Sequence, residues 1–490
     1  MMNRVRTAVS SLLNGIPVSP SLSAREPGPD LPLRFPYSRP DFLALSPDEV
    51  QCSADHGSRP ILILKEPKLP WRTGYAEVIN AGKSVLNEDQ ACCELLKLHK
   101  SPSDPNPHAT GRRRSSLPST DTLQQDRDDT LTTEDPQPLL LQFWGVFDGH
   151  GGSGSSLFCS QFLHQLLQQH LEDVLDVLRD PEMTPPTCLG QESPLNHPSH
   201  SSHHCRETQR GLSRAASLRA TETQSGAPRF FMEKKIQQES LVVGALENTF
   251  TEMDAQIARE RSIYSISGGC TALVVICLLG KLYVANAGDS RAVIVRSGEV
   301  LPMSNSFTPD SERQRLQLLA HLQPSLLGNE FTHLEFPRRV TKKEIGKRML
   351  YRDFSMNGCF HFGLNNARVL ATIGITRGLG DHDLKVHDSD VCIKPFMSCS
   401  PEVKVYNLSQ FDHGADDVMI LATDGLWDVL TNQEAAETVY TLAAQDLVMK
   451  ARGVLNDRGW RIAGDRPGSL DDISVFIIPL MYGSKQPQPS

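Results

Sequence analysis

Acidic side chains close three short apolar runs of this chain, each next to glycine. Asp148 follows LLLQFWGVF and precedes Gly149, Asp289 follows KLYVANAG, and Asp424 follows DVMILAT and precedes Gly425. Each run has the length and composition of a buried strand, so each acid should lie at a strand end beside the core. Carboxylates gathered there, with glycine allowing close backbone approach, could bind hard divalent cations, which prefer oxygen ligands.

Two further acid pairs extend this set. Asp471-Asp472 precedes the apolar run ISVFIIPL, and Glu88-Asp89 lies far upstream. A site for two divalent ions about 4 Å apart needs a shared carboxylate, further acids on each side and water in the remaining positions. In such a site Asp471 would hold one ion together with Asp424, and Glu88 and Asp89 would act directly or through ordered waters.

Asp148 is the expected bridging ligand. Gly149 follows it, so its carbonyl oxygen can reach a metal with no side chain in the way. A water shared by two cations becomes a nucleophile at neutral pH, and the metal charge offsets that of a phosphoryl group in transfer. His150 could protonate a leaving alkoxide, and Lys83 or Arg377 could hold phosphate oxygens. The residue types therefore point to phosphoryl transfer.

Each of these residues also has a plainer interpretation. Asp289 could cap a tight hairpin turn. Glu88 and Asp89 could be solvated charges, and His150 could be a histidine of a turn. A metal site is indicated by the whole set at strand ends, not by any single member.

Composition narrows the class of protein and its location. The 490 residues carry a net charge of -9 and a pI of about 6.0, which argues against general nucleic-acid binding. The longest apolar run, 270–279, is far shorter than the roughly 20 residues of a membrane helix. Eleven cysteines, an odd number without metal-type spacing, fit a reducing compartment. We expect a soluble cytoplasmic protein, with the nucleus as a second location.

The chain divides into a folded core and several polar segments. Residues 1–70 are rich in Pro, Ser and Arg and are expected to be mostly disordered. A core of 71–482 follows, with low-complexity insertions at about 100–136 and 181–228, and 483–490 form a short tail.

Hydrophobic spacing indicates the elements of the core. Helices are expected at 157–178, 239–261, 309–322 and 432–450, and strands in 273–302, 366–375 and 417–423. TGYAEVIN and ACCELLKL are expected to pair as neighbouring strands. Because helices and strands segregate along the chain, an antiparallel sandwich with helices on its faces is favoured over a doubly wound sheet.

The ordered motifs carry a family resemblance. They are Asn87-Glu88-Asp89, DGHGG at 148–152, SGGCTALV at 267–274, ANAGDSRAV at 285–293, ATIGITRGLGD at 371–381, PEV at 401–403, LATDGLWD at 421–428 and DDISV at 471–475. This series resembles the type-2C metal-dependent serine/threonine protein phosphatases over about 71–482. TGYAEVINAGKS, ARERS, FTHLEFPRR, KRMLYRD and RGLGDHDLK resemble the H/J/M branch, and most closely its J member.

The resemblance implies a fold and a set of roles. The fold would be α+β, a four-layer sandwich of two antiparallel sheets flanked by antiparallel helices, with two Mn²⁺ or Mg²⁺ ions between the sheets. Asp148, the Gly149 carbonyl, Asp424 and Asp471 would be ligands, and Glu88 and Asp89 would hold metal-bound waters. Asp289 would bind a weaker third ion, and His150 would be the general acid.

Two positions depart from the family pattern. Many members carry an arginine that grips phosphate just before the Glu-Asp pair, whereas this chain has Lys83, a point charge instead of a bidentate fork. Asp472 stands where many members have Asn, which should be tolerated because Asp471 is the matching ligand.

A segment at about 308–366 resembles the flap that this family places beside the active site. It could be a solvated charged surface, or it could dock acidic or phosphorylated protein substrates. Its basic residues are Arg338, Arg339, Lys342, Lys343, Lys347, Arg348 and Arg352. Residues 112–116 and 214–217 resemble basophilic kinase sites, and phosphorylation of Ser115 or Ser217 is left open.

Three functions are compatible with the acids. The first is a phosphatase acting on phosphoserine or phosphothreonine in proteins, and the second is a catalytically silent module that binds phosphoproteins. A third, a different two-metal hydrolase such as a nuclease, fits the acids but neither the acidic pI nor the motif order. A silent module should lack at least one of Asp148, Asp424 or Asp471, and all three are present.

Overall fold

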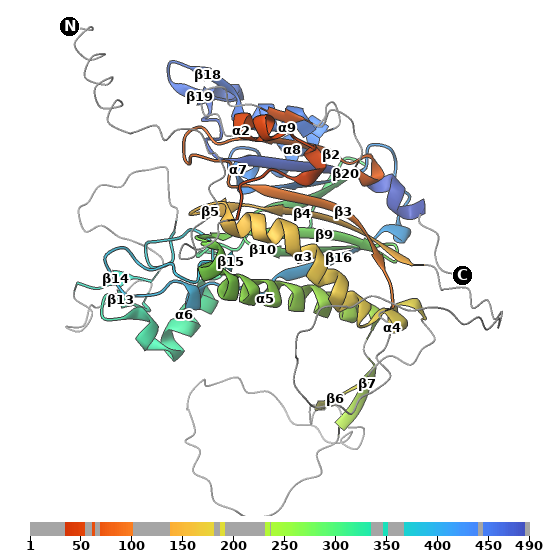
Figure 1. Cartoon of the computed structure of the whole chain (residues 1–490), viewed down its shortest axis with the longest axis horizontal. Coiled ribbons are helices and arrows are strands. Elements are labelled where there is room, and N and C mark those ends of the chain that lie inside the picture. Colours follow the sequence, from red (N-terminus) through yellow and green to blue (C-terminus); the bar gives the residue numbers. More distant parts are fainter. Residues whose placement is uncertain are drawn as a thin grey trace, which may run out of the picture.

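Two antiparallel β-sheets lie face to face at the centre of the molecule (Figure 1). The computed structural model describes residues 35–53, 61–63, 69–100, 138–180, 187–191, 231–235, 237–334, 346–350, 367–439 and 444–485. The six-stranded sheet has the order β1, β2, β20, β17, β11 and β12, with bounds Ile61–Ile63, Gly74–Val78, Ile473–Pro479, Val418–Ala422, Arg291–Arg296 and Glu299–Pro302. The five-stranded sheet has the order β16, β10, β9, β4 and β3, with bounds Glu402–Asn407, Lys281–Ala287, Ala272–Leu278, Leu139–Phe147 and Gln90–Leu98.

Helices cover the outer face of each sheet. The helices α3 (Gly154–Glu172), α4 (Leu175–Arg179) and α5 (Gln238–Tyr264) lie on the five-stranded sheet, and α8 (Asn432–Val439) and α9 (Ala444–Arg452) lie on the other (Figure 1). Buried residues of α5 recur at spacings of three and four, which gives one apolar face, at Leu246, Phe250, Met253 and Ile257. The result is the expected α+β fold with four layers.

The space between the two sheets is filled by apolar side chains from both. Trp144 of β4 is fully buried there with Leu273, Leu421 and Phe476. Its indole Nε1 donates a hydrogen bond to Thr73 Oγ1 at 3.1 Å, so its polar atom is satisfied. The inner strands β9, β10, β17 and β20 are buried on both faces, which explains why they are continuous apolar runs in the sequence.

Shorter elements surround the ends of the sheets. A three-stranded sheet of β5 (Gly149–His150), β8 (Gly269–Cys270) and β15 (Leu379–Gly380) adjoins α3 and α5. The flap contains α6 (Arg313–Leu322), β13 (Phe331–Thr332) and β14 (Arg348–Met349), packed on an apolar cluster of its own. The other elements are α2 (Pro47–Ser53), α7 (Asp424–Trp427), β6 (Thr187–Gln191), β7 (Phe231–Lys235), β18 (Val454–Asn456) and β19 (Gly459–Arg461), with 3-10 turns at Asp41–Leu43, Pro70–Arg72, Pro324–Leu327, Lys394–Phe396, Leu408–Gln410, Ala463–Asp465 and Leu480–Lys485.

Most predicted elements are present, with three corrections. The strands β2 and β3 do not pair: β2 pairs with β1 and β20 in one sheet, and β3 with β4 in the other. Residues 367–375 are not a strand but turns closed by an isolated bridge between Val369 and Ile373. The predicted helix 157–178 is divided into α3 and α4 by a turn at 173–174, which local periodicity does not reveal. Of the predicted helix 432–450 the structure describes α8 and α9, and 440–443 lie outside the described residues.

Residues before position 70 are more ordered than the composition predicts. Residues 35–53 pack on the core, where Phe35 contacts the α3 and α5 layer and Phe42 contacts the six-stranded sheet. β1 extends the six-stranded sheet at its edge. The expectation of disorder is therefore wrong for these parts, whose two aromatic anchors offset the polar composition around them.

Several predicted segments lie outside the described residues. These include the motifs at 112–116 and 214–217, nearly all of both insertions, and five of the seven flap cations. In the second insertion, residues 187–191 form β6 and pair with β7, where a structureless loop was expected. No helix within the described ranges is long and apolar enough to cross a membrane.

Candidate active site and metal centre

The strand ends that carry the acids all meet at one end of the sandwich. In the five-stranded sheet, the ends of β4 and β10 and the start of β3 lie together, because each neighbouring strand reverses direction. In the other sheet, the ends of β17 and β2 and the start of β20 do the same. A cleft of about 550 Å³ opens there, lined by the acids Glu88, Asp148, Asp289, Asp424, Asp428, Asp471 and Asp472.

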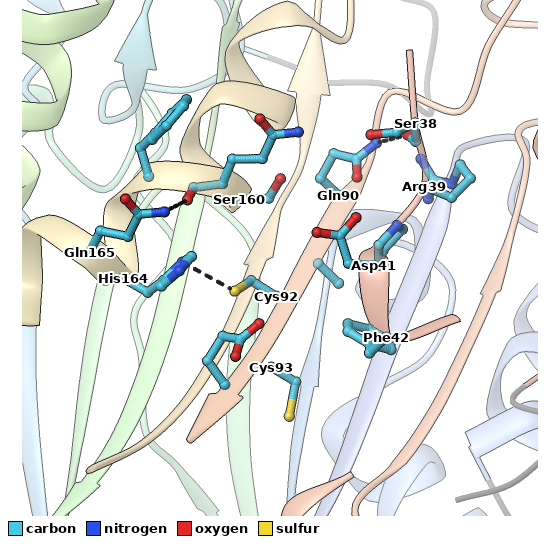
Figure 2. Close-up of a pocket in the computed structure, with 15 residues that line it drawn as sticks. Ser38, Arg39, Asp41, Phe42, Gln90, Cys92, Cys93, Ser160, His164 and Gln165 are labelled. Carbon is cyan, nitrogen blue, oxygen red and sulfur yellow. Dashed lines mark hydrogen bonds between the residues drawn. The ribbon is translucent and has the colours of Figure 1, made fainter. Parts of the chain in front are cut away.

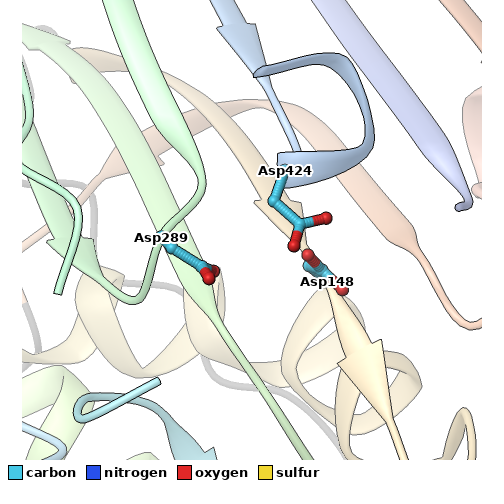
Figure 3. A group of neighbouring side chains, drawn as sticks. All are labelled: Asp148, Asp289 and Asp424. Carbon is cyan, nitrogen blue, oxygen red and sulfur yellow. The ribbon is translucent and has the colours of Figure 1, made fainter. Parts of the chain in front are cut away.

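Three of these acids converge on one point (Figure 3). Asp148 follows β4, Asp289 lies between β10 and β11, and Asp424 is the first residue of α7. One carboxylate oxygen from each lies within 4.8 Å of the others. The backbone oxygen of Asp148 accepts a hydrogen bond from Thr271 N at 2.9 Å, which ties its strand end to β9. Oxygen ligands this close, from three rigid elements, fit a divalent cation.

Mutual repulsion makes these acids unusual. Burial, and then the charges of Asp424, Asp89 and Asp289, raise the pKa of Asp148 well above its ordinary range. Burial and then Asp289 and Asp471 raise the pKa of Asp424 in the same way. The pKa of Asp289 is raised to about 6, first by burial and then by Asp428. A bound cation would relieve both causes, since it offers each carboxylate an opposite charge in place of lost water.

Asp148 and Asp424 are each followed by a glycine, because a neighbouring acid loop leaves no room for a side chain there. A Cβ on Gly149 would clash with the carbonyl oxygen of Glu88, and a Cβ on Gly425 would clash with the carbonyl oxygen of Asp472. The Asp-Gly pattern thus reflects direct backbone contact between acid-bearing segments.

The two acid pairs contribute one residue to the cleft wall and one to its support. Asp472 accepts hydrogen bonds from the backbone of Asn80 at 2.7 Å and Glu88 at 3.0 Å, and burial raises its pKa to about 6. Asp89 is buried and accepts from Thr423 Oγ1 at 2.8 Å. The Asp472 oxygens thus accept from backbone and amide donors, and the assignment of Asp471 as the ligand of the pair stays a prediction.

Glu88 and Asp471 face the cleft itself. Glu88 Oε1 accepts from Gly152 N at 2.8 Å. Asp471 forms an ion pair with Lys83, whose side chain is more than half exposed. Lys83 thus lies at the rim, where it can reach a bound anion.

His150 is held by a residue that the sequence analysis did not identify. Its Nε2 lies 2.7 Å from Asp381 Oδ2, and the Asp381 side chain is almost fully buried. Burial would lower the pKa of His150, but the hydrogen bond and charge of Asp381, with Asp289 and Glu88, raise it. The contact with Asp381 therefore orients the imidazole and favours its protonated form, as a proton donor requires.

Arg377 is held by contacts within the protein. Its guanidinium pairs with Glu312 at 2.7 Å, donates to the carbonyl of Ser400 at 3.0 Å, and stacks over the ring of Phe307. It is not among the residues that line the cleft, whereas Arg368 is. These contacts hold the guanidinium outside the cleft lining, so they do not support the role of Arg377 in holding phosphate oxygens, which stays a prediction.

Two site residues were missed for different reasons. Asp428 lies four residues after Asp424, one helical turn away on the same face, so its place at the cleft was readable from the spacing. Asp381 lies 231 residues from His150, and no local pattern links them.

Comparisons with known proteins agree with this geometry. The profile of the family described as Protein phosphatase 2C matches residues 186–320 and 357–457. The chain is 67% identical to Protein phosphatase 1H of Danio rerio, over all of both chains. It is 56% identical to Protein phosphatase 1H of Homo sapiens, covering 99% of this chain and 100% of the relative. It is 44% identical to the human Protein phosphatase 1J, over 98% and 99% of the two chains.

These identities support the H/J branch of the sequence analysis. The finer expectation of greatest likeness to the J member is not met, since identity is higher with the 1H relatives than with the 1J relative.

The metal-free protein should lose stability as pH rises. Asp148, Asp289 and Asp424 have raised pKa values, so the folded state binds more protons than the unfolded state, in which Asp titrates near about 3.9. The free energy of unfolding therefore falls as pH rises from about 4 through the raised folded pKa values. Added Mn²⁺ should raise the melting temperature by an amount that grows over the same interval, measured against EDTA by scanning fluorimetry. An increment independent of pH, or one kept in Asp148→Ala, would contradict the cluster as the metal site.

Proposed function

The chain belongs to the protein phosphatase 2C family and is a metal-dependent protein serine/threonine phosphatase, and we propose how its residues share the work of hydrolysis. The observation that carries the proposal is the convergence of Asp148, Asp289 and Asp424, within 4.8 Å, at the floor of an acidic cleft. A module that only bound phosphoproteins would not need three carboxylates so close that they repel one another. Without cations these carboxylates would also repel the phosphate of a bound phosphoprotein.

We assign the metal ligands from the donor set. Asp148, the Gly149 carbonyl, Asp424 and Asp471 would hold two Mn²⁺ or Mg²⁺ ions, and Asp289 with Asp428 would hold a weaker third. These are the hard oxygen donors that such ions prefer. When bound, the ions supply positive charge that acidifies a water for attack and offsets the charge of the phosphoryl oxygens.

The remaining acids, Glu88 and Asp89, would contact the metal ions only through water. Glu88 faces the cleft and Asp89 lies deeper, bonded to Thr423, so both would order waters and not bind an ion directly. Each carboxylate is itself held by a hydrogen bond from the protein, which would fix the waters that it orders.

His150 is proposed as the general acid. The hydrogen bond to Asp381 fixes the ring at the cleft and, with the neighbouring acids, raises the pKa of His150, which favours the form that can donate a proton. The proton would pass to the departing serine or threonine oxygen, which leaves poorly as an alkoxide. Asp381 is then a positioning residue that acts through His150.

Lys83 and Arg368 are proposed as the phosphate contacts on the substrate side. Both line the cleft, and Arg368 comes from the segment that follows the flap. Lys83 can exchange its contact with Asp471 for a phosphate oxygen when a cation occupies that carboxylate. The flap, tied to the core by Glu312 with Arg315 and Arg377, would dock the protein that carries the phosphate.

The cytoplasm, with the nucleus as a second location, is proposed as the compartment. The odd cysteine count supports a reducing environment, as do the free thiols among the described residues. Fractionation of cells that express the untagged chain would test this.

Loss of a metal ligand should abolish turnover. Asp148→Ala and Asp424→Ala are each expected to lower kcat/KM by at least about 100-fold, on an aryl phosphate and on a phosphothreonine peptide alike, because the cations serve both. Manganese-dependent release of phosphate is the measurement. Asp390→Ala serves as the control, because Asp390 is fully exposed and is not among the residues that line the cleft. Equal rates in all four proteins would discard the mechanism.

Removal of the proton donor should depend on the leaving group. His150→Ala is expected to slow the phosphothreonine peptide by about 100-fold or more, and the aryl phosphate far less, because a phenolate leaves without a proton. Asp381→Asn should also slow the phosphothreonine peptide more than the aryl phosphate, but by a smaller factor. Parallel losses on both substrates would mean that Asp381 supports only the fold.

Substrate docking and phosphate binding should separate experimentally. Lys83→Ala should raise KM for every substrate, since each presents a phosphate to the cleft.

Exchange of residues 308–366 for those of another family member should alter the preference among phosphoproteins and leave hydrolysis of the aryl phosphate unaffected. Unchanged preference among phosphoproteins would remove the docking role.

A further inference from the structure

An N-terminal segment crosses the edge of the sandwich beside the catalytic loops. We call residues 35–43 the strap. At its start Phe35 contacts Phe158 of α3 and Tyr264 of α5, with ring centroids 5.5 and 5.4 Å apart. At its end Phe42 contacts Tyr75 of β2 at 4.9 Å. The strap is therefore anchored on two different layers.

Between these anchors the strap buries a charged side chain. Arg39 and Glu77 of β2 both have 0% exposed side chains and form a bidentate pair, with Nε to Oε1 at 2.8 Å and Nη2 to Oε2 at 2.7 Å. A buried charge of this kind is tolerated only when its geometry and remaining hydrogen bonds are satisfied. The pair therefore fixes where the strap lies relative to β2.

The third nitrogen of Arg39 reaches the loop that carries the metal-centre acids. Nη1 donates to the carbonyl oxygen of Asp89 at 2.6 Å and to that of Asn87 at 3.3 Å. These carbonyls flank Glu88, whose side chain lines the cleft. The Arg39 guanidinium thus holds the backbone on both sides of Glu88 while leaving its carboxylate free to face the cleft.

One flank of the strap is not packed. A cavity of about 440 Å³ lies between the strap, β3 and α3 (Figure 2). Figure 2 shows Ser38 and Arg39 beside Gln90 on one side, and Cys92 with His164 on the other. Gln90 Nε2 donates to the carbonyl of Ser38 at 2.9 Å. The strap is thus held at separate points and not along its length, which makes Arg39 the link to the Glu88 loop.

We propose that the strap is a positioning element of the metal centre, and that Arg39 sets metal affinity by fixing the backbone around Glu88 and Asp89. Charge-assisted hydrogen bonds from a rigid guanidinium restrict this loop more tightly than a neutral donor would. The inference rests on the proposed function for the identity of the metal, and it makes the strap a support of the active site.

The test compares metal binding with stability. Arg39→Gln alone would leave Glu77 buried and unpaired, so the working variant is the double substitution Arg39→Gln with Glu77→Gln, which is neutral and keeps an acceptor for Tyr75. Two measurements are made: Mn²⁺ binding by calorimetry in the absence of substrate, and thermal unfolding in EDTA.

Three controls separate positioning from general weakening. Lys281→Gln with Glu239→Gln removes an ion pair elsewhere on the same core. Leu246→Ala, at a fully buried residue of α5, lowers stability without touching the strap. Arg39→Lys keeps the charge and removes the fork.

The double variant should weaken Mn²⁺ binding by about ten-fold, with kcat at saturating Mn²⁺ changed much less. Lys281→Gln with Glu239→Gln and Leu246→Ala should bind Mn²⁺ as the original chain does, and Arg39→Lys should be intermediate. Unchanged Mn²⁺ affinity in the double variant overturns the proposal, as does an equal loss in Leu246→Ala. Because calorimetry needs no turnover, failure of the phosphatase assignment would appear separately, as normal metal binding without hydrolysis.

Discussion

Repulsion among buried carboxylates is the constraint on which the rest of this structure depends. Asp148, Asp289 and Asp424 lie within 4.8 Å of one another, and each has a raised pKa because burial and its neighbours oppose its charge. Flexible loops would move apart under such repulsion. The acids instead follow strands of two packed sheets, whose ladders and shared core resist that movement. Stability is thus spent at one end of the sandwich to keep a cation site preformed.

Two buried arginines show how the acid loops are held without neutralising the acids. Arg39 donates to the carbonyl oxygens of Asn87 and Asp89, and Arg452 of α9 donates to those of Ile79 and Asp471, at 2.8 and 2.6 Å. In the acid loops each donates to these backbone carbonyl oxygens, and Arg39 directs its other two nitrogens to Glu77 of β2. A salt bridge to Asp471 or Glu88 from such a position would compete with the metal, whereas a contact to the carbonyl steadies the loop and leaves the carboxylate available.

The sequence predicted the features that depend on residues close together in the chain, and it did not predict contacts between residues far apart. The acids at strand ends, the helices α3 and α5 and the strands within 273–302 follow from neighbouring residues, and all are present. The sheet partners of β2 and β3, the pairing of His150 with Asp381, and that of Arg39 with Glu77 depend on residues far apart in the chain. The contact of Arg377 with Glu312 was not predicted for the same reason, because the two residues lie 65 positions apart. The strand-end acids indicated a metal site by themselves, whereas the substrate class came from motif order.

Gly149 and Gly425 have a further consequence. At each glycine the backbone lies so close to the carbonyl of the neighbouring acid loop that no Cβ fits between them. The spacing at these two contacts is therefore set by backbone atoms and not by side chains of the core. A single added methyl group at either glycine would change that spacing at once.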